Sequence, residues 1–180
     1  DPRPARGIYA TAMVAGSPQM MALADSLVAA GGNTIVFDIK DRDGALSYIS
    51  AVSLARQTQV TSLAPIHQPT ALVEQLHRRG LYVVARLSCF YDEHLAAIRP
   101  QLAPRLLDGT PWTSGWLDPA NDQVQEYLLD VVEEIVGFGI DEVQLDYIRF
   151  PTERSADSLL FAHADSLAKH QVITDFVRRV

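Results

Sequence analysis

The order of apolar and amphipathic segments constrains the fold of this chain more than any other feature. Four strand-like runs are expected, at residues 7–12, 33–38, 81–90 and 141–151. Helical periodicity lies between these runs and after the last one, at about 18–30, 69–79, 122–137 and 158–180, with a shorter helix at 93–98. Strands that alternate with helices predict a parallel sheet with right-handed crossovers.

Polar residues at the ends of three expected strands favour a barrel over an open, doubly wound sheet. Each strand carries two such residues in phase, so that one face becomes polar: Asp38 and Lys40, Arg86 and Ser88, and Gln144 and Asp146. In (β/α)8 barrels the catalytic residues lie at the carboxyl ends of several strands. The segment AMVAGSP lacks the G-x-G-x-x-G spacing of a dinucleotide site. The predicted fold is therefore α/β of the (β/α)8 barrel type, with about four of the eight β-α units present.

Length and charge narrow the function classes. The 180 residues suffice for one domain. A net charge of −7 and a pI near 5.1 argue against a general partner among nucleic acids or anionic membranes. No apolar run approaches the roughly 20 residues of a membrane span. The single cysteine, Cys89, excludes an intrachain disulfide and is expected to be a buried structural thiol.

The chain begins with Asp1 and the linker-like stretch DPRPARG. We therefore expect an excerpt or a mature form, with residues 1–6 as a linker or N-terminal extension and residues 7–180 as the domain. A removed export signal is compatible with this start.

The stretch DEVQLDYIRFP, residues 141–151, contains the strongest candidate for a functional residue. Alternate strand side chains point to opposite faces, so Glu142, Gln144 and Asp146 share one face. Carboxylates are seldom buried in a strand without a partner or a role. We interpret Asp146 as functional, with an ion pair to Arg86 or Arg149 as the structural alternative.

Five segments, which occur in the same order in a known family, carry a resemblance: GIYATA, VFDIKDRDG, LYVVARLSCFYDEHLA, WLDPAN and DEVQLDYIRFP. Together they resemble a bacterial family of glycoside hydrolase domains, a TIM barrel distantly similar to the α-amylase group. The resemblance extends from Gly7 to about Val180 and implies that this chain holds the N-terminal half of the barrel. It also implies that Asp146 is the catalytic nucleophile or base at the end of strand four. An arginine precedes that aspartate by two residues in the α-amylase group, whereas Gln144 occupies the position here.

Glycoside hydrolysis needs two carboxyl groups, one as acid and one as nucleophile or base. No other carboxylate of this chain clearly matches Asp146, so the acid is expected from the second half of the barrel. The remaining candidates are expected to bind substrate: Asp38, Lys40, Arg86, Gln144, Trp116, Asp118 and Arg149. Most of them have a structural alternative, such as an internal ion pair for Asp38 and Lys40 or a helix cap for Asp118.

Neither a metal nor a cofactor is expected. The segment Asp41-Arg42-Asp43-Gly44 does not meet the spacing of a calcium loop, and the five histidines form no metal-ligand spacing. Tyr9, Tyr91 and Tyr147, like the tryptophans, offer rings on which sugars can stack, although core packing is the commoner role of any one aromatic residue.

Two other functions remain open at this point. One is a non-catalytic carbohydrate-binding or scaffold domain, and the other is a lyase that uses Lys40 as its base, which requires a desolvated amine. By resemblance, the substrate is expected to be a polysaccharide of the cell envelope or the extracellular space. Four β-α units alone leave two open sheet edges and an uncovered apolar inner surface, so this piece by itself is expected to self-associate.

Overall fold

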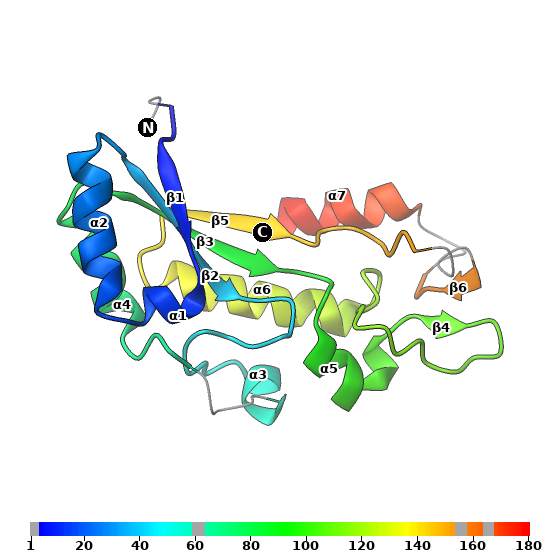
Figure 1. Ribbon diagram of the computed structural model, residues 1–180. Helices are drawn as coiled ribbons and strands as arrows, with labels where there is room; N and C mark the ends of the chain where they lie inside the picture. The colour runs from blue at the N-terminus through cyan, green and yellow to red at the C-terminus, as the bar shows by residue number, and fades with distance from the viewer. Residues whose placement is uncertain (1–3, 59–63, 154–157, 164–167) are drawn as a thin grey trace.

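Four parallel strands form the main sheet of the protein. Figure 1 shows the computed structural model, which describes residues 4–58, 64–153, 158–163 and 168–180. The strands follow the order β1-β2-β3-β5 across the sheet. Their bounds are Gly7–Ala10 for β1, Thr34–Lys40 for β2, Tyr82–Ser88 for β3 and Glu142–Asp146 for β5. All three pairings are parallel, as the alternation of strands and helices predicts.

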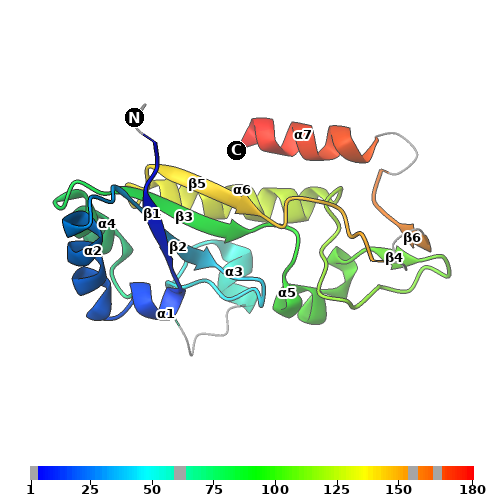
Figure 2. The same cartoon turned by 45° about the horizontal axis from the view of Figure 1, so that its top comes forward.

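The helices between the strands, together with the last helix of the chain, bury one face of the sheet. They are α1 (Ala12–Ala15), α2 (Gln19–Ala29), α4 (Pro69–His77), α6 (Asp122–Val136) and α7 (Lys169–Arg179). Ile35 and Leu87 of the strands are fully buried, and they share one core cluster with Met20 of α2, Leu76 of α4 and Leu128 of α6. Figure 2 shows α6 running along the back of the sheet behind β3 and β5. The strand faces opposite this core are therefore the inner face of the barrel.

Helix α6 illustrates how local sequence sets the position of β5. Asn121 caps it, because its Oδ1 accepts hydrogen bonds from the N–H groups of Gln123 (2.9 Å) and Val124 (3.3 Å). Its apolar stripe, as the periodicity predicts, is buried: Val124, Leu128, Val131, Val132 and Ile135. The helix ends just before the turn that leads into β5. Asn121, rather than Asp118, is therefore the cap.

The end of the chain differs from the expected single helix over 158–180. Leu159–Leu160 form strand β6, which pairs in antiparallel fashion with β4 (Arg105–Leu106). Helix α7 begins only at Lys169 and buries Val172 and Phe176. Two further short elements were not expected, namely α3 (Ser53–Thr58) and the 3-10 turn η2 (Pro100–Leu102). The short helix α5 (Glu93–Ile98) was expected. Together with β4 and β6, α5 and η2 form the region beyond the carboxyl ends of the strands (Figure 1).

The inner face of the sheet is mixed in character rather than apolar as expected. Tyr9 is 52% exposed, and Glu142 and Gln144 are exposed, whereas Val84 of the neighbouring strand is buried. Within the described residues, β1 and β5 each have a strand on one side only. The sheet is therefore an arc of a barrel, and the expected self-association stays a prediction. Among the described helices, none has the length and hydrophobicity needed to cross a membrane.

Candidate active site

Arg86 joins two carboxylates at the carboxyl ends of the central strands. Its Nη1 donates to Asp38 Oδ1 at 2.7 Å, while its Nε and Nη2 donate to Asp146 Oδ2 at 2.9 and 2.5 Å. Asp38 lies directly opposite Arg86 in the pairing of β2 and β3, and Asp146 lies opposite Ser88 in the pairing of β3 and β5. The three side chains therefore meet because of the strand register, as the alternation of each strand predicts.

The three charged groups differ in their access to solvent. The side chain of Asp38 is 2% exposed, that of Arg86 17% and that of Asp146 40%. Partial burial lowers the pKa of Arg86, but hydrogen bonds to Asp38 and Asp146 outweigh this effect and raise it above the ordinary value. Arg86 therefore keeps its charge, and Asp146 is the member of the trio that a substrate can reach.

Tyr9 of β1 adds a fourth group, which the sequence did not single out among the site residues. Its hydroxyl donates a hydrogen bond to Asp38 Oδ2. Burial of this hydroxyl, followed by the bond to Asp38, raises the pKa of Tyr9 to about 12. Both oxygens of Asp38 thus accept hydrogen bonds, one from Tyr9 and one from Arg86. Asp38 is therefore held as an acceptor that positions Arg86. The sequence signal that could have revealed Tyr9 is its position on β1, where its side chain points to the same face of the sheet as Asp38.

Lys40 does not belong to this site, contrary to the prediction that it shares a face with Asp38. A bulge between Asp38 and Lys40 shifts the register, so that Lys40 pairs with Leu87 instead of Ser88. Its side chain is fully buried, its Nζ lies 2.8 Å from Asp92 Oδ2, and it donates to the carbonyl of Ser88 at 3.1 Å. The amine is committed to an internal ion pair, which removes the basis for a lyase that uses Lys40.

Asp118 is also structural, which corrects its prediction as a substrate-binding residue. It is 4% exposed. Its Oδ1 accepts from the N–H of Ala120 at 2.9 Å, and its Oδ2 accepts from the N–H of Ala162 at 2.7 Å. Burial raises the pKa of Asp118, and these backbone hydrogen bonds partly offset the rise. The carboxylate ties the loop before α6 to the segment that contains β6.

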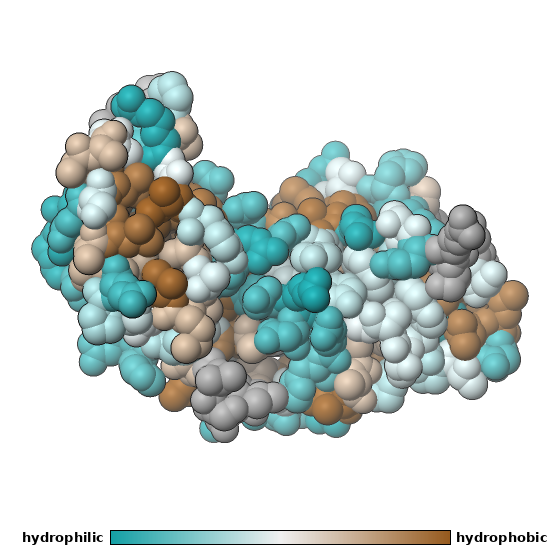
Figure 3. Space-filling model, viewed as in Figure 1, coloured by the Kyte–Doolittle hydropathy of each residue, from teal (hydrophilic) through white to brown (hydrophobic). Residues whose placement is uncertain are grey.

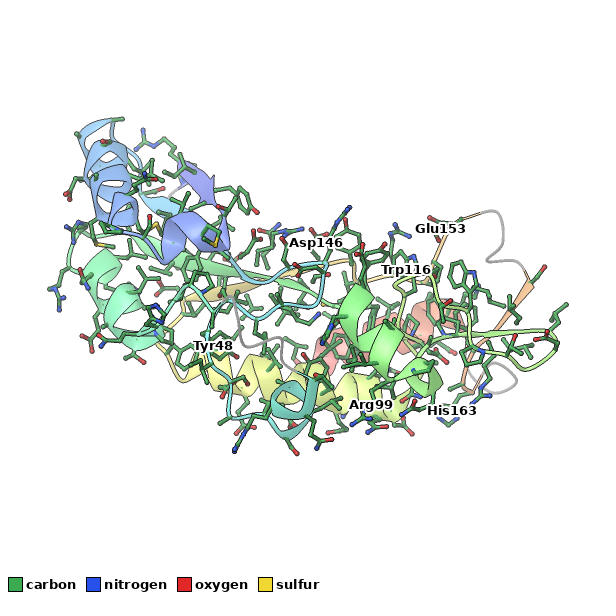
Figure 4. All side chains as sticks on the ribbon, turned by 60° about the horizontal axis from the view of Figure 1, so that its bottom comes forward. Tyr48, Arg99, Trp116, Asp146, Glu153 and His163 are labelled. Carbon is green, nitrogen blue, oxygen red and sulfur yellow. The ribbon has the colours of Figure 1, made fainter. Side chains whose placement is uncertain are left out.

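Trp116 is 1% exposed, so its ring cannot bind substrate as predicted. Its Nε1 donates to Glu153 Oε1 at 3.0 Å, and the guanidinium of Arg149 lies 4.6 Å from its ring centroid. Arg149 also donates to the carbonyl of Phe150 (3.2 Å) and to Thr152 Oγ1 (3.0 Å). These contacts make Arg149 an anchor of the loop after β5. Figure 4 shows Trp116 and Glu153 side by side in the region beyond Asp146.

The remaining sequence candidates occupy the positions that their strands impose. Gln144 lies opposite Arg86 in the sheet with an exposed side chain, and its role in binding substrate stays a prediction. Cys89 is buried, and burial raises its pKa to about 12, in agreement with a structural thiol. Within the described part of the chain, no group of three or more His, Cys, Asp or Glu side chains is arranged to hold a metal ion.

The carboxyl ends of the strands form a hydrophilic surface. Figure 3 shows hydrophilic residues over the ends of β2 and β3, whereas apolar residues gather over β1. A cavity of about 460 Å³ lies at the opposite, amino-terminal ends of the strands, where Tyr82, His77 and Asp141 line it. Active sites of barrel enzymes lie at the carboxyl ends. We therefore place the candidate site at Asp146 and not at this cavity.

Comparison with known structures supports the barrel assignment. The crystal structure of a hypothetical protein from Ruminiclostridium thermocellum ATCC 27405 is 31% identical with a TM-score of 0.83, and the match covers 95% of this chain and 89% of that chain. An α-L-fucosidase from Paenibacillus thiaminolyticus is 17% identical with a TM-score of 0.66, covering 98% of this chain and 29% of that one. An α-galactosidase from Thermus thermophilus is 18% identical with a TM-score of 0.61, and the match covers 99% of this chain and 36% of that one.

This chain thus spans about a third of the length of the two enzymes, and at such identities the likeness shows the fold alone. The four β-α units form part of a TIM barrel, as predicted. A comparison with curated protein sequences gives no match. A family model described as "Putative glycosyl hydrolase domain" matches residues 7–180. This match extends over nearly the whole chain and includes every strand of the arc that carries Asp38, Arg86 and Asp146, so the protein belongs to that glycosyl hydrolase domain family.

Proposed function

We propose that this protein is the N-terminal half of a barrel that hydrolyses glycosidic bonds, with Asp146 as the catalytic nucleophile or general base. The position of Asp146 carries the proposal: it ends β5, its side chain is 40% exposed, and Arg86 holds one of its oxygens. A nucleophile or base must also be held in a defined position, and Arg86 Nε and Nη2 both donate to Asp146 Oδ2, at 2.9 and 2.5 Å.

The general acid comes from another part of the complete barrel. Asp38 is the nearest carboxylate along the hydrogen-bonded chain, but its side chain is 2% exposed and its two oxygens accept hydrogen bonds from Tyr9 and Arg86, so neither oxygen is directed towards a substrate. Hydrolysis with retention needs carboxyl groups about 5–5.5 Å apart, and hydrolysis with inversion about 6.5–9.5 Å apart. The acid therefore lies within about 10 Å of Asp146.

A polysaccharide of the cell envelope or the extracellular space is the substrate we propose. The support for this choice is the resemblance of the sequence to bacterial glycoside hydrolase domains. Asp146 could also be a purely structural ion-pair partner in a non-catalytic carbohydrate-binding barrel, because Arg86 and the N–H of Tyr147 already occupy both of its oxygens. Activity of the Asp146 variant separates the two functions.

The test is turnover of the full-length protein on a panel of polysaccharides, with Asp146→Asn and Glu142→Gln assayed in parallel. Glu142 is the matched control, because it lies on the same face of the same strand but opposite Val84, and its Oε2 accepts from the hydroxyl of Tyr82 rather than from Arg86. We expect Asp146→Asn to lower kcat by at least about a hundredfold and Glu142→Gln to leave it unchanged. Undiminished turnover by Asp146→Asn would remove this residue from the mechanism.

A further inference from the structure

Tyr147, which directly follows Asp146, has a backbone conformation that is unusual for a large side chain. Its φ angle is 49°, in the left-handed region that glycine and asparagine normally occupy. Such a conformation persists only where the surrounding structure imposes it, and residues of this kind gather at functional sites. The conformation of Tyr147 is therefore a reason to ask what its ring and its amide do beside Asp146.

Contacts on three sides fix Tyr147 relative to Asp146. Its N–H donates to Asp146 Oδ1 at 2.8 Å, and its carbonyl accepts from the N–H of Phe90 at 3.3 Å. Its ring lies 5.3 Å from that of Tyr91 with an interplanar angle of 32°, and 6.1 Å from that of Trp116. The ring of Tyr147 and the carboxylate of Asp146 therefore form one rigid unit.

Trp116 provides the buried base of this unit. It packs edge to face against Tyr91, with ring centroids 5.1 Å apart and an interplanar angle of 86°. Glu153 holds its Nε1, and Ser88 Oγ donates to the carbonyl of Tyr91 at 2.7 Å. Tyr91 and Tyr147 are half-buried, whereas Trp116 is buried. The two tyrosines, which we call the tyrosine platform, thus present part of their surface above a fixed tryptophan.

The charges around the platform indicate which sugars it accepts. Carboxylates outnumber arginines in the vicinity of Asp146 and the platform: Asp38, Asp41, Glu93, Asp146 and Glu153 against Arg42, Arg86 and Arg149. Arg86 is shared between two carboxylates, and Arg149 lies over Trp116 and anchors its loop. An anionic sugar would meet an excess of like charge. A neutral sugar stacks its apolar C–H face on an aromatic ring without that penalty.

We propose that the tyrosine platform binds a neutral hexopyranose unit next to Asp146. This inference rests on the proposed function for its biological sense, but it concerns binding and is tested without turnover. Tyr91 and Tyr147 supply the stacking surface, and the left-handed backbone of Tyr147 sets the position of that surface relative to the carboxylate.

The experiment measures binding by the full-length protein in the Asp146→Asn background, in which hydrolysis does not consume the ligand. Maltohexaose, cellohexaose and chitohexaose are titrated by isothermal calorimetry. We expect at least one of them to bind, and Tyr147→Gly to weaken its Kd about tenfold, equivalent to about 1.4 kcal/mol. Glycine accepts the φ angle and removes the whole side chain, the ring and its hydroxyl together. The matched control is Tyr147→Phe, which keeps the ring and should bind within about twofold of the background protein.

A second measurement on the protein with both tyrosines intact does not depend on how the variants fold. Nitration by tetranitromethane, followed by peptide mass spectrometry, reports the reactivity of each tyrosine. Saturating hexasaccharide should protect Tyr91 and Tyr147 but leave Tyr82, at the amino-terminal end of β3, unchanged. Absence of this protection would overturn the proposal.

The other outcomes separate the platform from the proposed function. If none of the three hexasaccharides binds, or if Tyr147→Gly binds as tightly as the background protein, the platform is refuted. Equal losses in Tyr147→Phe and Tyr147→Gly would also refute it, because the hydroxyl and not the ring would then be responsible. If the hexasaccharide binds as expected but the protein with Asp146 intact hydrolyses nothing, the platform stands and the proposed hydrolase activity fails.

Discussion

Replacing Lys40 with methionine tests the buried ion pair behind the site. The side chains of Lys40 and Asp92 are 0% and 2% exposed, and their charged atoms lie 2.8 Å apart. Removing one partner of such a pair leaves an uncompensated buried charge and destabilises a protein by about 3–5 kcal/mol. Asp92 Oδ1 still accepts from the N–H of Leu95 at 2.7 Å in the variant. We therefore expect the lower end of this range, about 3 kcal/mol.

For a domain of this size, each kcal/mol lowers Tm by about 2–4 °C, so Lys40→Met should melt about 6–12 °C lower. Urea unfolding followed by circular dichroism gives the free energy of unfolding, and calorimetry gives Tm. Asp92→Asn and the double variant complete the cycle, because the amide oxygen can still accept from Leu95. The free energy of unfolding lost in the double variant should be smaller, by about 1–3 kcal/mol, than the sum of the losses in the two single variants. A loss below about 1 kcal/mol in Lys40→Met, or additivity within about 0.5 kcal/mol, would refute a tightly coupled buried pair.

Three further outcomes follow from other contacts. Titration at 295 nm should show one tyrosine with a pKa of about 12 that is absent in Tyr9→Phe and moves towards 10 in Asp38→Asn. Because Tyr9 ionises less readily in the folded than in the unfolded protein, the free energy of unfolding should fall as pH rises from about 10 to about 12. A free energy of unfolding that stays constant over this range would contradict the raised pKa of Tyr9. Asn121→Ala should lose about 1 kcal/mol in urea unfolding, since it removes the cap of α6; Asp122→Asn is the control, because the side chain of Asp122 is exposed and lies outside the cap. Gly44→Ala should destabilise by about 1–3 kcal/mol, because Gly44 has a φ of 92° and an added Cβ would lie 2.0 Å from Asp92 Oδ1; an unchanged melting temperature would show that the loop adapts.

The alternation of polar and apolar residues predicted the core of the candidate site. Asp38, Arg86 and Asp146 meet because each lies at the carboxyl end of a strand on the inner face, and parallel pairing aligns those ends. The helical stripe of α6 was also predictable, since its apolar residues recur at helical spacing over the whole helix. Long elements with regular periodicity repeat the same physical preference many times, so tertiary contacts rarely override it.

Single-residue irregularities account for much of what the sequence could not predict. The bulge in β2 reverses the face of Lys40, and strict alternation contains no signal for it. The ring of Trp116 lies in a polar loop, yet contacts with Tyr91, Arg149 and Glu153 bury it, and these residues are remote in sequence. The segment that contains β6 was predicted to be helical. It forms a strand instead, because β4, more than 50 residues earlier in the chain, offers it a pairing edge.

The bulge in β2 has a consequence for protein engineering and for the evolution of this fold. A substitution at Lys40 only empties a buried position, and deletion of Ile39 would restore regular pairing with Lys40 still opposite Leu87. One residue inserted between Ile39 and Lys40, with the bulge kept, would place Lys40 opposite Ser88, in the same row as Asp146. One added codon, rather than a series of point mutations, would thus carry a primary amine from the interior to the mouth of the barrel. Length variation within β2 is therefore a route by which this scaffold can acquire amine chemistry.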